Sequence, residues 1–97
     1  MTITYSVIKN PVEKKIKKNL CAHLHCYNID NFDNIYAKYI NLIINNFYVI
    51  ITFSIGNIIP NLDCVIIKSL NKGGDIGGKF VCINYLLKMN IKYNFIL

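Results

Sequence analysis

Two short segments of the chain carry residue types that do chemistry, and the first is glycine-rich. Residues 71–80 hold four of the five glycines within six positions, around Asp75. An apolar run at 64–67 precedes this segment, and a helical pattern follows it. A strand, a glycine turn and a helix in this order present backbone N–H groups to a ligand at the carboxyl edge of a sheet. Asp75 then has three available roles, which are capping the helix, binding a hydroxyl or holding a metal ion.

The spacing of these glycines matches no standard nucleotide site. It departs from the G-x-G-x-x-G of dinucleotide-binding turns and from the G-x-x-x-x-G-K-[ST] of P-loops. A tight loop needs glycines whether or not it binds anything. A ligand-binding turn and a plain structural turn therefore both remain open.

The second segment is residues 20–27, an apolar run that contains two histidines and predicts a strand. Alternation places Cys21, His23 and His25 on one face of this strand. Two or three metal-ligand types sit together there, but a fourth ligand is missing, so structural histidines are the simpler interpretation. His25 lies near the carboxyl end of the strand, where α/β proteins bind ligands. Tyr27, at the strand end, is placed to stack on a ligand.

The rest of the chain predicts the elements that would position these residues. A helix follows, capped by Asn28 or Asp30, and its apolar positions recur at helical spacing: Phe32, Ile35, Tyr36, Tyr39, Ile40 and Ile43. A later helix over 76–89 presents a second apolar set: Ile76, Phe80, Ile83 and Leu87. The intervening runs predict strands at 47–53, 64–70 and 93–97, the first of them apolar throughout, as in strands buried on both faces.

This alternation predicts an α/β fold with a mainly parallel sheet and flanking helices. We expect a basic N-terminal segment over 1–19 and one small α/β domain over 20–97. The final strand reaches Leu97 without a polar tail, so we expect a chain truncated at its C-terminus. An unpaired last strand would also favour self-association.

Composition narrows the classes of function. The net charge is +6, but the chain has no arginine, and four lysines gather at 14, 15, 17 and 18, so we expect a solvated basic segment rather than a nucleic-acid partner. The four cysteines have no C-x-x-C spacing and apolar neighbours, which favours free buried thiols and a reducing, cytoplasmic location. Residues 39–60 lack charge and are long enough to span a bilayer, although asparagines interrupt them.

Three pieces of the sequence together resemble a known family. They are the strand His-Leu-His-Cys-Tyr at 23–27, the strand Val-Ile-Ile-Thr-Phe at 49–53, and Asn-Lys-Gly-Gly-Asp-Ile-Gly at 71–77. In order and spacing they resemble the rhamnan synthesis F family of glycosyltransferase-related proteins. That family has a histidine-bearing first strand, a second strand ending in threonine and an N-[KR]-G-x-D-I-G turn. Similar domains occur in large DNA viruses with AT-rich genomes. A viral origin, implied by this resemblance, would place the chain in the host cytoplasm.

The resemblance implies a Rossmann-like half-domain of a nucleotide-sugar glycosyltransferase acting in polysaccharide synthesis. Asn71, Gly73, Asp75 and Gly77 match the motif position by position, and the resemblance implies that they shape the pocket for a nucleotide sugar or a carbohydrate acceptor. His25 joins them less directly, as part of the first strand. The resemblance implies that Asp75 binds either sugar hydroxyls or a divalent metal, Mn or Mg, which is the implied cofactor.

The chain also departs from the family pattern. It has no D-x-D motif, and it ends before the H-[ST]-K segment that the family carries. The fragment alone is therefore expected to be inactive, and two alternatives remain. One is a non-catalytic α/β interaction module, and the other is a small membrane protein spanning at 39–60.

Overall fold

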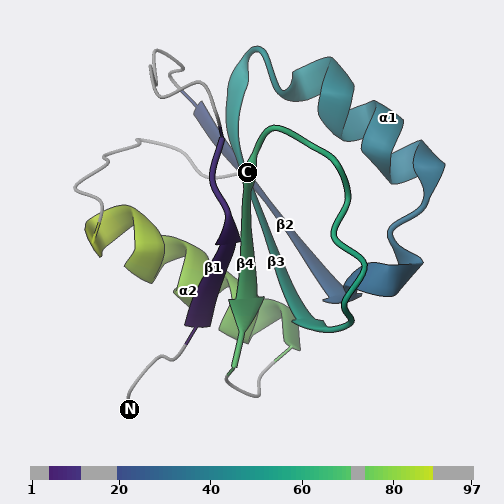
Figure 1. Cartoon of the computed structure of the whole chain (residues 1–97). Coiled ribbons are helices and arrows are strands. Elements are labelled where there is room, and N and C mark those ends of the chain that lie inside the picture. Colours follow the sequence, from purple (N-terminus) through teal and green to yellow (C-terminus); the bar gives the residue numbers. More distant parts are fainter. Residues whose placement is uncertain (1–4, 12–19, 71–73, 89–97) are drawn as a thin grey trace.

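A computed structural model describes residues 5–11, 20–70 and 74–88, with the backbone alone for residues 34, 35 and 74–76. Four strands form one sheet with a helix on each face (Figure 1). The strands are β1 (Tyr5–Lys9), β2 (Leu20–Asn28), β3 (Phe47–Ile55) and β4 (Val65–Ser69). The helices are α1 (Asn34–Ile43) and α2 (Gly74–Lys88), and a single 3-10 turn, η1 (Ile29–Asn31), precedes α1. The α/β fold expected from the sequence is confirmed.

The sheet is mixed, in the order β1-β4-β3-β2. Strands β2, β3 and β4 run parallel, whereas β1 pairs antiparallel with β4. β3 is central because its residues are apolar on both faces, and every residue from Tyr48 to Phe53 is buried. The carboxyl ends of the parallel strands lie at one edge of the sheet, and His25 lies three residues before the end of β2. The strand expected at 93–97 and the lysine cluster at 14–18 lie outside the described residues.

Alternate residues of β3 serve two separate cores. Tyr48 and Ile50 pack with Val81 and Tyr85 of α2 on one face of the sheet. Val49, Ile51 and Phe53 pack on the other face, together with Ile40 of α1. The period-2 pattern of the strand therefore decides which helix each side chain meets.

The buried face of α2 differs from the sequence prediction. Phe80, Ile83 and Leu87 are all exposed, Leu87 by 73%. The residues that pack on the sheet are Val81, Cys82, Tyr85 and Leu86. Both stripes have helical spacing, and the second wins because Gly78 lies on the same face and lets the helix approach the strands closely.

The predicted apolar face of α1 is only partly buried. Ile40 is 2% exposed, but Tyr36 and Tyr39 are 53% and 60% exposed. The predicted caps also shift. Asn28 caps η1 by accepting a hydrogen bond from the Asp30 N–H, while the Asp33 carboxylate accepts one from the Tyr36 N–H and begins α1.

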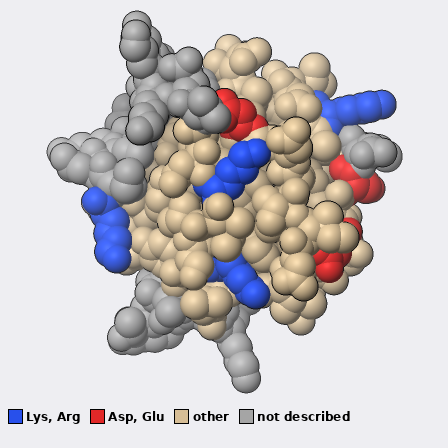
Figure 2. Space-filling view, viewed as in Figure 1, with Lys and Arg blue, Asp and Glu red and all other residues tan. Residues whose placement is uncertain are grey.

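The uncharged run at 39–60 is not one helix, because it contains the end of α1, a turn and β3. Among the described residues, no helix is long and apolar enough to cross a membrane. The cysteines are free thiols, and three of them, Cys21, Cys64 and Cys82, are buried as expected. On the face of the molecule drawn in Figure 2, the described lysines and aspartates are spread singly among uncharged atoms.

Candidate functional site

A hydrogen-bonded trio of polar side chains lies under the start of α2. The Thr52 hydroxyl of β3 lies 2.8 Å from His23 Nε2 and 2.8 Å from His25 Nδ1, both on β2. Register explains the meeting, because β2 and β3 are parallel and His25 pairs with Thr52. The alternation predicted from the sequence, with both histidines on one face, is therefore confirmed.

The single Thr52 hydroxyl bonds to both imidazole rings, and this restricts which ring nitrogens carry the protons. A threonine hydroxyl donates one hydrogen bond and accepts up to two. With both rings neutral, Thr52 donates to one ring nitrogen and accepts an N–H from the other. The tautomers of His23 and His25 are therefore coupled through Thr52, since reversing the hydroxyl requires both rings to change.

Helix α2 lies directly on this trio through Gly78, which is itself buried. A Cβ atom at position 78 would lie 2.7 Å from Thr52 Oγ1 and closer still to His25 Nδ1. Real Cβ atoms do not approach other atoms so closely, so the contact requires glycine. The glycine-rich segment thus brings backbone, rather than side chain, against the polar trio.

The surroundings keep His23 uncharged. The pKa of His23 is lowered from 6.5 to about 3, mainly by burial, and the nearby charges of Lys79 and His25 contribute in the same direction. His23 is therefore neutral at physiological pH. It serves as a hydrogen-bonding group and not as a cation.

Next to the trio, two thiols meet where β2 packs against α2. Cys21 of β2 hydrogen-bonds to Cys82 of α2, and both side chains are fully buried. This bond and burial raise the pKa of Cys21 far above its ordinary value. The bond from Cys21 lowers the pKa of Cys82, and the positive charge of Lys79 acts in the same direction. Cys82 is consequently the thiol of the pair that ionises first.

The loops at the carboxyl edge are tied together by Asp30. Its carboxylate accepts hydrogen bonds from the Asn57 and Ile58 N–H groups at 2.8 and 2.7 Å. These two bonds lower the pKa of the exposed Asp30 carboxyl. Gly56, at φ +109°, makes the turn that points those amides at Asp30. The η1 turn and the end of β3 are thereby held side by side.

Some of the site residues expected from the sequence lie at the trio, and others lie outside the described residues. His25 lies in the trio, and Gly77 lies in the first turns of α2 next to Gly78. Asp75 falls within α2 rather than before it, and its side chain lies outside the described residues, as do Asn71 and Gly73 entirely. Tyr27 is 65% exposed at the end of β2.

Sequence reasoning missed Thr52, Gly78 and Lys79 as parts of the site. Thr52 could have been identified, because it is the only serine or threonine in the apolar run 47–53. Gly78 could also have been identified, because it shares helical spacing with Val81, Cys82 and Tyr85. No sequence feature distinguishes Lys79, because lysine is common throughout this chain.

The described side chains do not assemble the expected Mn or Mg site. Among them, no three residues of the types His, Cys, Asp and Glu lie close enough to hold a metal ion. The ring nitrogens of His23 and His25 nearest the site are bonded to Thr52. Hard divalent cations also prefer carboxylate and carbonyl oxygens to imidazole. We therefore derive no step through a metal.

No protein-family model, no curated protein and no solved structure matches the chain.

Proposed function

We propose that the chain is a glycosyltransferase-related α/β domain that binds a nucleotide sugar at the carboxyl edge of its parallel strands. In this proposal β2, β3 and β4, with α2, form a Rossmann-like half-domain of the rhamnan synthesis F type. The complete protein would transfer the sugar to a carbohydrate acceptor during polysaccharide synthesis.

One observation carries the proposal. The first two pieces that resemble the family meet where Thr52 of the second bonds to His25 of the first, and Gly78, which directly follows the third piece, lies on both. This place lies in the carboxyl-terminal halves of the parallel strands β2 and β3, near the edge at which α/β folds bind ligands. The first backbone N–H groups of a helix have no partner within the helix, so the start of α2 suits the negative charge of a diphosphate.

The proposed roles follow from these positions. Asn71, Gly73 and Gly77 would shape the pocket around the diphosphate, and Asp75 would bind sugar hydroxyls. His25 and Thr52 would hold the floor of the pocket in place beneath Gly78. Catalysis in the complete protein would then rest on positioning the donor and stabilising the departing diphosphate.

Thermal melting of the chain with nucleotide sugars tests the proposal. UDP-glucose, GDP-mannose and dTDP-rhamnose are suitable probes, each compared with its free nucleoside diphosphate. A ligand at 100 times its Kd stabilises the folded state by about 2.7 kcal/mol, which raises Tm by about 10 °C or more in a domain of this size. We expect one nucleotide sugar to produce such a rise.

Two aspartate variants locate the binding. Asp75→Ala should abolish the ligand-induced rise while changing the ligand-free Tm little. Asp63→Ala is the matched control, because Asp63 is exposed and precedes β4 at the opposite edge of the sheet. The proposal fails if no nucleotide sugar raises Tm, or if Asp63→Ala removes the rise as completely as Asp75→Ala does.

A non-catalytic interaction module is the second candidate. The observation that favours it is the trio itself, since both histidines bond to an interior hydroxyl and His23 is held neutral. Buried polar groups that bond only to one another are also compatible with a purely structural contact between a helix and a sheet. The melting experiment separates the two candidates, because the module has no reason to respond to nucleotide sugars.

A further inference from the structure

The two edges of the sheet are built differently. β1 forms one edge and has only five residues, and its register with β4 shifts between Val7 and Lys9. It also ends in Lys9, and Pro11 follows two residues later. Short length, an irregular register, lysine and proline are the features by which natural sheets prevent further strands from pairing. The β1 edge is thus protected.

β2 forms the other edge and has none of these features. It has nine residues, of which none is charged and none is proline. Its register with β3 runs without a shift from Leu20 opposite Phe47 to Cys26 opposite Phe53. Within the described ranges, no strand pairs with its outer side. A long, regular and uncharged edge of this kind is a template for another strand.

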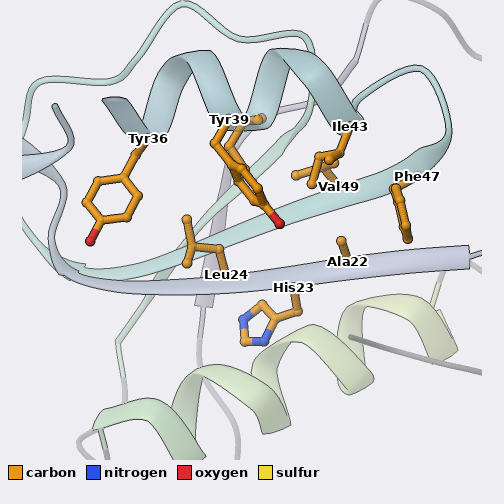
Figure 3. A pocket seen from close by; sticks show the side chains of 9 residues that line it. Ala22, His23, Leu24, Tyr36, Tyr39, Ile43, Phe47 and Val49 are labelled. Carbon is orange, nitrogen blue, oxygen red and sulfur yellow. The ribbon is translucent and has the colours of Figure 1, made fainter. Parts of the chain in front are cut away.

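An apolar hollow lies beside this edge, between β2 and α1. Its volume is about 250 Å³. Figure 3 shows the Tyr36 and Tyr39 rings reaching down from α1 toward Leu24 and Ala22, while the His23 ring points the other way, toward α2. Tyr36 and Tyr39 are 53% and 60% exposed. Large apolar side chains of α1 are therefore exposed beside the β2 edge, where an added strand would lie.

We propose that the β2 edge is a homodimer interface, in which β2 of a second copy pairs antiparallel across a two-fold axis at Leu24. Leu24 is the midpoint of Leu20–Asn28, so this register gives every residue of β2 a partner. Leu24 then faces Leu24 of the other copy, and Ala22 faces Cys26. A two-fold interface uses the same patch on both copies, so the patch must be compatible with itself.

Charge and closure favour a second copy over other partners. β2 has no charged side chain, so the two-fold pairing sets no like charges opposite each other, although the chain carries +6 overall. An acidic protein or a nucleic acid would seek basic groups, and β2 offers none. His23, which would face His25 of the other copy, is neutral. After pairing, both outer edges of the eight-stranded sheet are protected β1 strands, so assembly stops at two.

Sedimentation of the full chain tests this interface. Across a concentration series we expect a species of twice the 11.2 kDa chain mass. Leu24→Lys sets two positive charges opposite each other at the axis, and we expect it to sediment at the single-chain mass with an unchanged far-UV circular dichroism spectrum. Val7→Lys is the matched control, because it places the same charge on an exposed position of the β1 edge and should remain dimeric.

Cross-linking gives an answer even if Leu24→Lys does not fold. In a Cys26→Ser background the remaining cysteines are buried, so Leu24→Cys supplies one accessible thiol. A short bismaleimide should join two copies through it, whereas Val7→Cys in the same background should stay single. The inference is overturned by a single-chain mass throughout the series, by a folded Leu24→Lys that stays dimeric, or by equal cross-linking from Val7→Cys. It does not depend on nucleotide-sugar binding.

Discussion

Gly78→Ala should destabilise the protein, although the same change stabilises most helices. Alanine in a helix interior is favoured over glycine by about 1 kcal/mol. Here the new Cβ would lie 2.7 Å from Thr52 Oγ1 and 2.8 Å from His25 Cγ. Neither neighbour moves freely, because the two are hydrogen-bonded to each other at 2.8 Å. Overpacking of this kind costs about 1–3 kcal/mol. We therefore expect a net loss of up to about 2 kcal/mol.

Urea and thermal unfolding of a double-mutant cycle measure this loss and its cause. A net loss of 1 kcal/mol lowers Tm by about 4–8 °C in a domain of this size. His25→Ala removes the ring that the new methyl group meets, so Gly78→Ala in that background should be neutral or stabilising. The difference between the two backgrounds should reach about 1 kcal/mol or more.

Two results would refute the reasoning. The first is a higher Tm for Gly78→Ala in the otherwise unchanged chain, which would mean that α2 does not lie on the trio. The second is an equal effect of Gly78→Ala in both backgrounds, which would mean that His25 is not what the methyl group meets.

Three further predictions test the trio and the edge loops by unfolding measurements. Thr52→Val should cost about 1–3 kcal/mol, because two imidazoles lose a partner, and Thr52→Ser should cost less. As pH falls from 6.5 to about 3, stability should fall by up to about 1.4 kcal/mol per pH unit, because the unfolded chain binds a proton that folded His23 does not. His23→Gln should flatten that slope, and an equal slope would contradict the assignment. Asp30→Asn should lower Tm at pH 7 but not well below pH 3.8, because the stability that a lowered carboxyl pKa provides is present above 3.8 and is lost in acid. Equal losses at both pH values would argue against the two backbone bonds.

The elements of the fold were largely predictable because their signals are local. Apolar runs bounded by polar residues predicted β2, β3 and β4, and helical spacing predicted α1 and α2, each within a few residues of its observed bounds. The buried faces of the helices were harder to predict. More than half of this chain is apolar, so α2 carries two apolar stripes, and only packing on the sheet decides between Phe80 and Val81.

Only the part of the site that lies on a single strand could be predicted from the sequence. Alternation along β2 was sufficient to place His23 and His25 on the same face. Their contact with Thr52 depends on the register between two strands that are separated by α1, and no local pattern specifies that register. The contact of Gly78 with the trio depends in turn on how α2 packs across β2 and β3. The sequence therefore predicted members of the site but not the contacts that unite them.

The trio is a costly way to build a contact between a helix and a sheet. Thr52 is fully buried in the middle of an apolar strand, and burying a hydroxyl and two imidazoles is tolerated only because they bond to one another. Valine at 52 and aliphatic residues at 23 and 25, with alanine at 78, would fill the same space without desolvating polar groups. A domain selected for stability alone has no need of the polar version. Stability given up in one place is typical of sites shaped for another task. Here His25 and Thr52 of the trio lie three residues before the ends of β2 and β3, beneath the glycine-rich first turns of α2. That position suits the proposed binding role, in which the trio fixes the start of α2.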